Sequence, residues 1–98
     1  MSTENRDSAG RVVIVLDAGT TEGYRTARAL LADGCRVVAT DRHAAALVRI
    51  LHDQPADRLL LLAADDSQRN LVLAKAKARF GRVDSVIRPA ALPLTLSA

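Results

Sequence analysis

Apolar positions along the chain gather into short runs that alternate with longer segments of mixed polarity. The run at 11–16, Arg-Val-Val-Ile-Val-Leu, is nearly continuous and β-branched, which is typical of a strand buried on both faces. The leucine-rich run at 58–63 also suits a helix, but its shortness and the preceding Pro-Ala-Asp favour a strand. The pattern therefore predicts four strands, at 11–16, 35–40, 58–63 and 83–87.

Three segments between these strands carry apolar residues at helical spacing. They predict helices over 21–33, 43–53 and 67–80. Gly34 and Gly81 follow the first and third of these segments, and glycine is the residue expected just past a helix end.

Strands that alternate with helices of this length indicate βαβ units. Right-handed crossovers then predict an α/β fold, a Rossmann-like three-layer half-domain with a four-stranded parallel sheet of order 3-2-1-4. Residues 11–87 form this domain, 1–10 a polar flexible tail, and 88–98 an apolar tail whose alternating leucines suit an edge strand. Ligands of such sheets bind outside the carboxyl ends of the strands, near strand 1.

Composition narrows the class of protein. No apolar run reaches the roughly 18 residues of a membrane span. The formal net charge is +3, but the cations are scattered and only Tyr24 and Phe80 are aromatic, which argues against a nucleic-acid partner. The single cysteine, Cys35, excludes an internal disulfide and fits a cytoplasmic protein. The two histidines have no partner at ligand spacing, so no metal site is expected.

Several short sequence motifs, taken in their order along the chain, resemble the amino-terminal part of a short-chain dehydrogenase/reductase. The resemblance covers most of this chain but well under half of a complete family member, and it implies an NAD-binding type of Rossmann domain. The motifs are Thr26-Ala-Arg-Ala-Leu30, Ala32-Asp-Gly34, Arg36-Val-Val-Ala-Thr-Asp41, Leu62-Ala-Ala-Asp65 and Arg79-Phe-Gly-Arg-Val-Asp84.

The glycine turn of this family, Thr-Gly-x-x-x-Gly-x-Gly, is altered here. The aligned stretch keeps only its last glycine, Gly23, while Asp17 and Thr21 replace the first two and Gly19 stands between them. A carboxylate about 4 Å from a cofactor phosphate is unfavourable by roughly 4 kcal/mol at an effective dielectric near 20. We therefore expect no tightly bound cofactor, and at most weak NAD binding.

Two aspartates match family positions that meet the adenosine half of the cofactor. Asp41 aligns with the acidic residue that holds the ribose, and Asp65 with the aspartate beside the adenine ring. Each also precedes a predicted helix and can serve as a helix cap. Gly19, Gly23, Asp41 and Asp65 are thus the candidate cofactor-binding residues. Both interpretations stay open for Asp41, whereas the sequence favours the helix cap for Asp65.

The family's catalytic residues have no counterparts in this sequence. The stretch after strand 4 is Arg88-Pro-Ala-Ala91 where the family has Asn-Asn-Ala-Gly, and no serine or Tyr-x-x-x-Lys follows it. The resemblance then implies a non-enzymatic truncated module that acts by self-association or protein binding. A weak NAD or adenine-nucleotide sensor and a basic module for nucleic acid or ribosomes are the alternatives, as is a fragment of a larger dehydrogenase.

The predicted topology also indicates a partner. The first two crossover helices cover one face of the sheet, and the third covers the other face alone. Because strands 1 and 3 are apolar on both sides, we expect an uncovered face and an open strand-4 edge. A homodimer or a protein heteromer formed there is the expected assembly.

Overall fold

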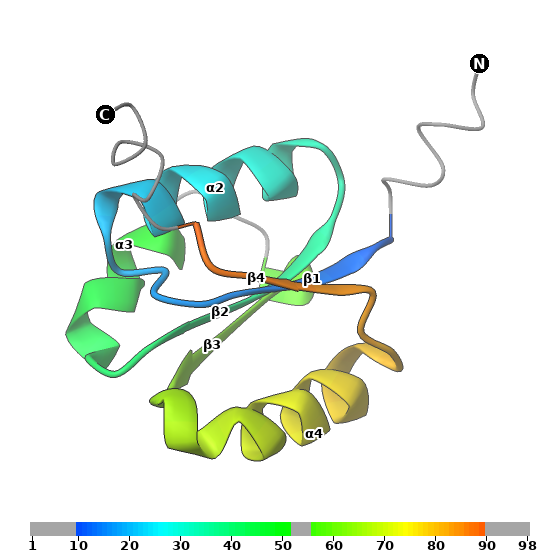
Figure 1. The fold of residues 1–98 in the computed structure, drawn as a ribbon. Helices are drawn as coiled ribbons and strands as arrows, with labels where there is room; N and C mark the ends of the chain where they lie inside the picture. The colour runs from blue at the N-terminus through cyan, green and yellow to red at the C-terminus, as the bar shows by residue number, and fades with distance from the viewer. Residues whose placement is uncertain (1–9, 52–55, 90–98) are drawn as a thin grey trace, which may run out of the picture.

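The computed structural model describes residues 10–51 and 56–89, and Figure 1 shows them as a sheet between two helical layers. The elements in chain order are β1 (Val12–Val15), α2 (Thr21–Ala32), β2 (Arg36–Asp41), the 3₁₀ turn η1 (Ala44–Leu47), α3 (Val48–Leu51), the 3₁₀ turn η2 (Ala56–Arg58), β3 (Leu59–Ala63), the 3₁₀ turn η3 (Asp66–Gln68), α4 (Arg69–Phe80) and β4 (Ser85–Ile87).

The predicted sheet is confirmed. All three strand pairs are parallel and the order is β3-β2-β1-β4. Val13 of β1 stands opposite Val37 of β2 and Ser85 of β4, so β1 is a central strand with a neighbour on each side. The leucine run also forms a strand, since Leu59 is opposite Val37 in β2.

The two faces of the sheet bury separate apolar clusters. Helices α2 and α3 cover one face, where Val13, Val15 and Val37 pack with Leu31 and Ile50. Within the described part of the chain, α4 is the helix that covers the other face, and Figure 1 shows it below the sheet. There it packs on the cluster of Ile14, Leu16, Val38, Ala64, Val72 and Ala76.

Helix α4 covers more of the sheet than the sequence suggested. We expected strand 1 to leave an apolar face open, yet Val12 and Ile14 are fully buried. The small side chain of Ala76, itself fully buried, lets the helix lie close to the central strands. Exposure is confined to the edges, where Leu60 of β3 is half-buried and Val86 of β4 is 37% exposed.

Helix ends agree with prediction at two of the three segments. Gly34 follows α2 with φ +93°, and Gly81 ends α4 with φ +89°, both in the left-handed region that favours glycine. The segment predicted as a helix over 43–53 is instead η1 followed by the four-residue α3, and 52–55 lie outside the described residues. The tails at 1–9 and 90–98, including the proposed edge strand, lie outside them too.

Candidate functional site

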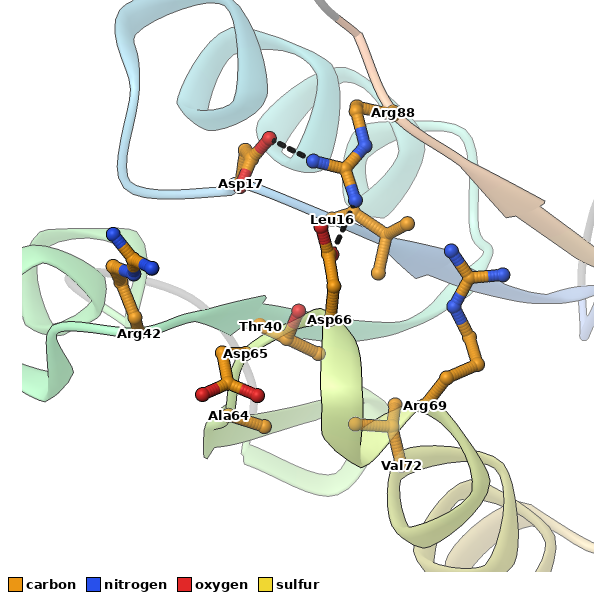
Figure 2. Close-up of a pocket in the computed structure, with 10 residues that line it drawn as sticks. All are labelled: Leu16, Asp17, Thr40, Arg42, Ala64, Asp65, Asp66, Arg69, Val72 and Arg88. Carbon is orange, nitrogen blue, oxygen red and sulfur yellow. Dashed lines mark hydrogen bonds and ion pairs between the residues drawn. The ribbon is translucent and has the colours of Figure 1, made fainter.

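Three side chains meet where β1, β3 and β4 end. Asp17 follows β1 in the turn to α2, Asp66 opens η3 beyond β3, and Arg88 directly follows β4. The Arg88 guanidinium bridges the two carboxylates, with Nη1 donating to Asp17 Oδ2 at 2.6 Å and Nη2 to Asp66 Oδ1 at 2.5 Å, as Figure 2 shows. The hydrogen bond to Asp66 is the main reason why the pKa of Arg88 is raised.

This ion-pair bridge, defined as Asp17, Arg88 and Asp66, lies at the point where ligands of open α/β sheets normally bind. Strand order reverses at β1, since β2 and β3 lie to one side of it and β4 to the other. The crevice outside the carboxyl ends of β1 and β4 is therefore the switch point of the sheet. Because Arg88 joins Asp17 across it, the crevice is spanned by protein atoms.

The β1–α2 turn explains how an aspartate replaces a glycine there. Asp17 has φ +56°, a left-handed conformation that aspartate tolerates better than most residues. Thr20 caps α2 by accepting a hydrogen bond from the Gly23 N–H at 3.0 Å, and its hydroxyl donates to the Asp17 carbonyl at 2.8 Å. Thr21, at the second altered glycine position, is exposed in the first turn of α2.

Gly23 is required by close packing rather than by an unusual φ. A Cβ built at this position would lie 2.2 Å from the Asp17 carbonyl oxygen and 2.6 Å from the Ala18 Cα. Both are backbone atoms, so no rotation of a side chain could make room. The retained glycine thus fixes the start of α2 against the turn that carries Asp17.

Asp41 holds the same turn from the other side. Its side chain is nearly buried, with Oδ2 accepting from the Gly19 N–H at 2.9 Å and Oδ1 from the His43 N–H at 3.0 Å. A Cβ at Gly19 would lie 2.6 Å from both Asp41 Oδ2 and Ala46 Cβ. Gly19 and Asp41 are therefore brought together, and the carboxylate ties the glycine turn to the residues that follow β2.

Asp65 is a helix cap. Its Oδ1 accepts from the backbone N–H of Ser67 at 3.0 Å and from the Ser67 hydroxyl at 2.6 Å, and Gln68 completes a capping box by accepting the Asp65 N–H. The hydrogen bonds from Ser67 lower the pKa of Asp65. The capping interpretation of Asp65 is confirmed, and the carboxylate stays ionised at the rim of a pocket.

That pocket lies on the α4 side of the crevice and has a volume of about 270 Å³. Its apolar wall is formed by Leu16, Ala64 and Val72, and its rim carries three arginines and three aspartates (Figure 2). The lining residues are Leu16, Asp17, Thr40, Arg42, Ala64, Asp65, Asp66, Arg69, Val72 and Arg88.

Sequence reasoning found Asp65 and Asp17 but missed the arginines of this pocket. Arg42 directly follows Asp41, and Arg69 is the first residue of α4. No local motif marks them or Arg88, because their proximity depends on four strands ending at one edge of the sheet. The one available signal was the replacement of an asparagine by Arg88 in the family pattern.

Other reactive side chains lie elsewhere. Cys35 is buried just before β2, at the amino ends of the strands and so opposite to the ion-pair bridge. Burial raises the pKa of its thiol. Within residues 10–51 and 56–89, no group of three or more His, Cys, Asp or Glu side chains is arranged to hold a metal ion. The helices of those segments include none long and apolar enough to cross a membrane.

Comparisons with known proteins agree with this arrangement. The family model described as short chain dehydrogenase matches residues 11–97. A short-chain dehydrogenase structure from Streptomyces avermitilis is 34% identical over 82% of this chain and 30% of its own, with a TM-score of 0.70. One from Bacillus anthracis is 26% identical over 86% and 36%, with a TM-score of 0.74.

A third structure was solved with a bound cofactor. The 3-ketoacyl-(acyl-carrier-protein) reductase from Brucella melitensis, complexed with NADH, is 28% identical over 81% of this chain and 34% of its own, with a TM-score of 0.73. No curated protein matches the chain. This sequence spans about a third of the length of these structures. The match of the family model over nearly all of the sequence establishes that the chain belongs to the short-chain dehydrogenase family.

Proposed function

We propose that this chain is a non-enzymatic, short-chain-dehydrogenase-like module that binds protein, in the first place a second copy of itself, through the β4 side of its sheet. The observation that carries the proposal is the contrast between two neighbouring residues. Ile14 and Val86 are opposite each other on adjacent strands and point to the same face. Ile14 is fully buried beneath α4, whereas Val86 is 37% exposed.

The position of Val86 at the outer strand of the sheet supports a partner at β4. Helix α4 connects β3 to β4, so the chain crosses the sheet from the β3 edge to the β4 edge. A further parallel strand beyond β4 would be reached by another right-handed crossover, whose helix would lie on the same face as α4 and over β4. Among the described residues no further strand pairs with the outer edge of β4, and Val86 keeps 37% of its surface exposed. A second copy that pairs β4 with β4 would satisfy the open backbone groups and cover both Val86 side chains.

The ion-pair bridge supports the non-enzymatic part of the proposal. It spans the crevice through which a dinucleotide would pass, so the protein's own side chains occupy the route of the cofactor. The pure chain should then show no hydride transfer with NAD or NADP on alcohols or ketones. A cytoplasmic location and the absence of a nucleic-acid partner remain predictions from composition.

Light scattering of the purified chain tests the proposal. We expect a mass of about twice 10.5 kDa. Val86→Lys should give a monomer, because a lysine on an edge strand opposes pairing. Val48→Lys is the matched control, since Val48 is 62% exposed on α3, away from β4, and this variant should remain a dimer. A wild-type monomer, or loss of the dimer in the Val48 variant, would contradict the proposal.

A second candidate function is weak binding of adenine nucleotides. It is supported by the pocket beside Asp65, whose volume of about 270 Å³ is just below the 300–1,000 Å³ typical of small-molecule sites. The Brucella relative, which holds NADH, shares this part of the fold. Since Arg88 and Asp17 close the crevice next to the pocket, we expect a Kd for NAD at or above about 1 mM.

Calorimetric titration with NAD, AMP and ADP-ribose tests this second candidate. The double variant Asp17→Gly and Arg88→Asn removes the bridge across the crevice and should bind NAD at least about tenfold more tightly, a gain of about 1.4 kcal/mol. The double variant leaves the net charge unchanged, and Arg36→Asn is the control for the loss of an arginine as such, because Arg36 is exposed at the far end of β2. Micromolar NAD binding by the unmodified chain would show that the bridge is no barrier.

A further inference from the structure

The outer edge of β4 offers its backbone hydrogen-bonding groups at one residue of the strand. The Ile87 carbonyl accepts from the Leu16 N–H at 2.8 Å, so the backbone groups of Ile87 face β1. Successive residues of a strand direct these groups to opposite sides, which turns the N–H and C=O of Val86 outward. Since β4 is only Ser85–Ile87, a strand that pairs with its outer edge is centred on Val86.

Charged residues flank Val86 in a self-complementary order. Asp84 directly precedes β4 and Arg88 directly follows it, each two positions from Val86. If a second copy pairs antiparallel with Val86 opposite Val86, Asp84 of each chain stands opposite Arg88 of the other. Opposite charges that face each other across antiparallel strands are stabilising. A shift of the pairing by two residues would instead set the apolar Val86 opposite a charged residue.

The Asp84 carboxylate has an oxygen left for such a pair. Its Oδ2 accepts from the Val12 N–H at 2.8 Å and from Arg82 Nε at 2.9 Å. Within the part of the chain that the structure describes, Oδ1 accepts no hydrogen bond, and the side chain is 28% exposed. An arginine that approaches from outside β4 can therefore bind Asp84 without displacing these contacts.

Arg88 cannot serve this position and the ion-pair bridge at the same time. Asp17 follows β1 and Asp66 lies beyond β3, so both partners in Figure 2 are on the inner side of β4. Asp84 of a second copy would lie on the outer side, on a strand about 4.8 Å away. The bridge is exposed to solvent, and exposed ion pairs contribute little, so its exchange for an intermolecular pair costs little.

We propose that two copies pair their β4 strands antiparallel about Val86, and that each Arg88 leaves Asp17 and Asp66 for Asp84 of the second copy. The crevice at the carboxyl end of β1 is then bridged in the single chain and open in the dimer. Self-association thereby regulates access to the crevice. The exchange rests on the proposed self-association, to which it adds a register and a regulatory consequence.

Two charge-reversal variants test the pairing. Arg88→Asp sets carboxylates opposite each other in its own dimer and Asp84→Arg sets guanidiniums opposite each other, so each alone should dimerise at least about fivefold more weakly than wild type. An equimolar mixture restores both opposite-charge pairs, and its heterodimer should associate within about twofold of wild type. Analytical ultracentrifugation measures all three. If wild type dimerises but the mixture is as weak as the single variants, the register is overturned while the self-association stands.

A cysteine on the two-fold axis reports the register without altering either charge. Under mild oxidation Val86→Cys should form a disulfide between two copies, because residues directly opposite each other have Cα atoms about 5.5 Å apart. Ser85→Cys is the matched control, since two such positions are offset along the strands and lie about 8 Å apart, beyond the reach of a disulfide. Cys35 is buried in either variant. Cross-linking of Ser85→Cys rather than Val86→Cys would overturn the proposal.

Removal of the inner partners tests the exchange of Arg88. In the double variant Asp17→Asn and Asp66→Asn, Arg88 gives up no ion pair on assembly, so the Kd of the dimer should fall at least about threefold. Asp33→Asn with Asp57→Asn is the matched control, because it removes the same charge from two exposed positions outside the crevice and should change the Kd by less than about twofold. Equal Kd values for the two double variants would overturn the exchange, whereas a monomeric wild type would overturn it together with the proposed self-association.

Discussion

Replacing Gly23 with alanine isolates the close contact that fixes the start of α2. The added Cβ would meet the Asp17 carbonyl oxygen at 2.2 Å and the Ala18 Cα at 2.6 Å, both on the backbone. Overpacking by one carbon costs about 1–3 kcal/mol, and rigid backbone neighbours place this case near the upper end. Alanine recovers up to about 1 kcal/mol of helix propensity over glycine. The net loss is then about 2 kcal/mol, which lowers the Tm by about 8–16 °C for a chain of this size.

Thermal unfolding followed by circular dichroism measures this loss, and Gly81→Ala is the matched control. A Cβ at Gly81 meets no heavy atom within 4 Å, but Gly81 has φ +89°. Its substitution carries backbone strain without a clash and should cost about 1 kcal/mol. If Gly23→Ala at the same protein concentration were no less stable than Gly81→Ala, the proposed packing of α2 against the β1 turn would be refuted.

Three further outcomes are expected. Ile14→Ala, in the fully buried centre of the sheet, should cost about 2–5 kcal/mol in urea unfolding, whereas Val48→Ala on the exposed side of α3 should cost less than about 1 kcal/mol. The Val12 N–H donates a hydrogen bond to Asp84 and lowers the pKa of this carboxyl below its ordinary value of 3.8. The ionised carboxylate therefore stabilises the fold above pH 3.8, and this stabilisation is lost as the pH falls through the pKa of Asp84 in the folded chain. Acid titration of Asp84→Asn should accordingly show a weaker loss of stability below about pH 4 than wild type. Cys35, buried and with a raised pKa, should react with iodoacetamide at least about tenfold more slowly in the folded than in the unfolded chain.

Local patterns were sufficient to predict the strands and their order. The β-branched run of β1 and the glycines after α2 and α4 are signals that a short window of sequence contains. The segment after β2 was predicted less well, because alanines and leucines at helical spacing do not reveal that η1 and α3 divide it. The prediction that α4 could not cover β1 was wrong. The alanines of α4 suggested too little apolar surface, but the small side chain of Ala76 lets the helix lie close to the sheet.

In the candidate site, too, contacts between residues close in the sequence were predictable and contacts between distant residues were not. Asp65 caps a helix through neighbours two and three residues away, and the sequence favoured this interpretation. Asp41 acts across 22 positions on the Gly19 N–H, a role that neither the ribose-binding nor the helix-cap interpretation described. Arg88 pairs with Asp17 across 71 positions, and the sequence marked each residue only as a separate departure from the family pattern, not as one of a pair.

The bridge also makes the substitutions at these two positions interdependent. Asp17 alone would leave an unmatched carboxylate at the carboxyl end of β1, and Arg88 without Asp17 would keep only its exposed pairing with Asp66. Each change therefore alters the background in which the other is tolerated, and a double-mutant cycle between them should be non-additive. A return toward the family's pattern would depend on the order of the two changes, because reverting Arg88 alone leaves Asp17 without its cation, whereas reverting Asp17 alone leaves Arg88 paired with Asp66.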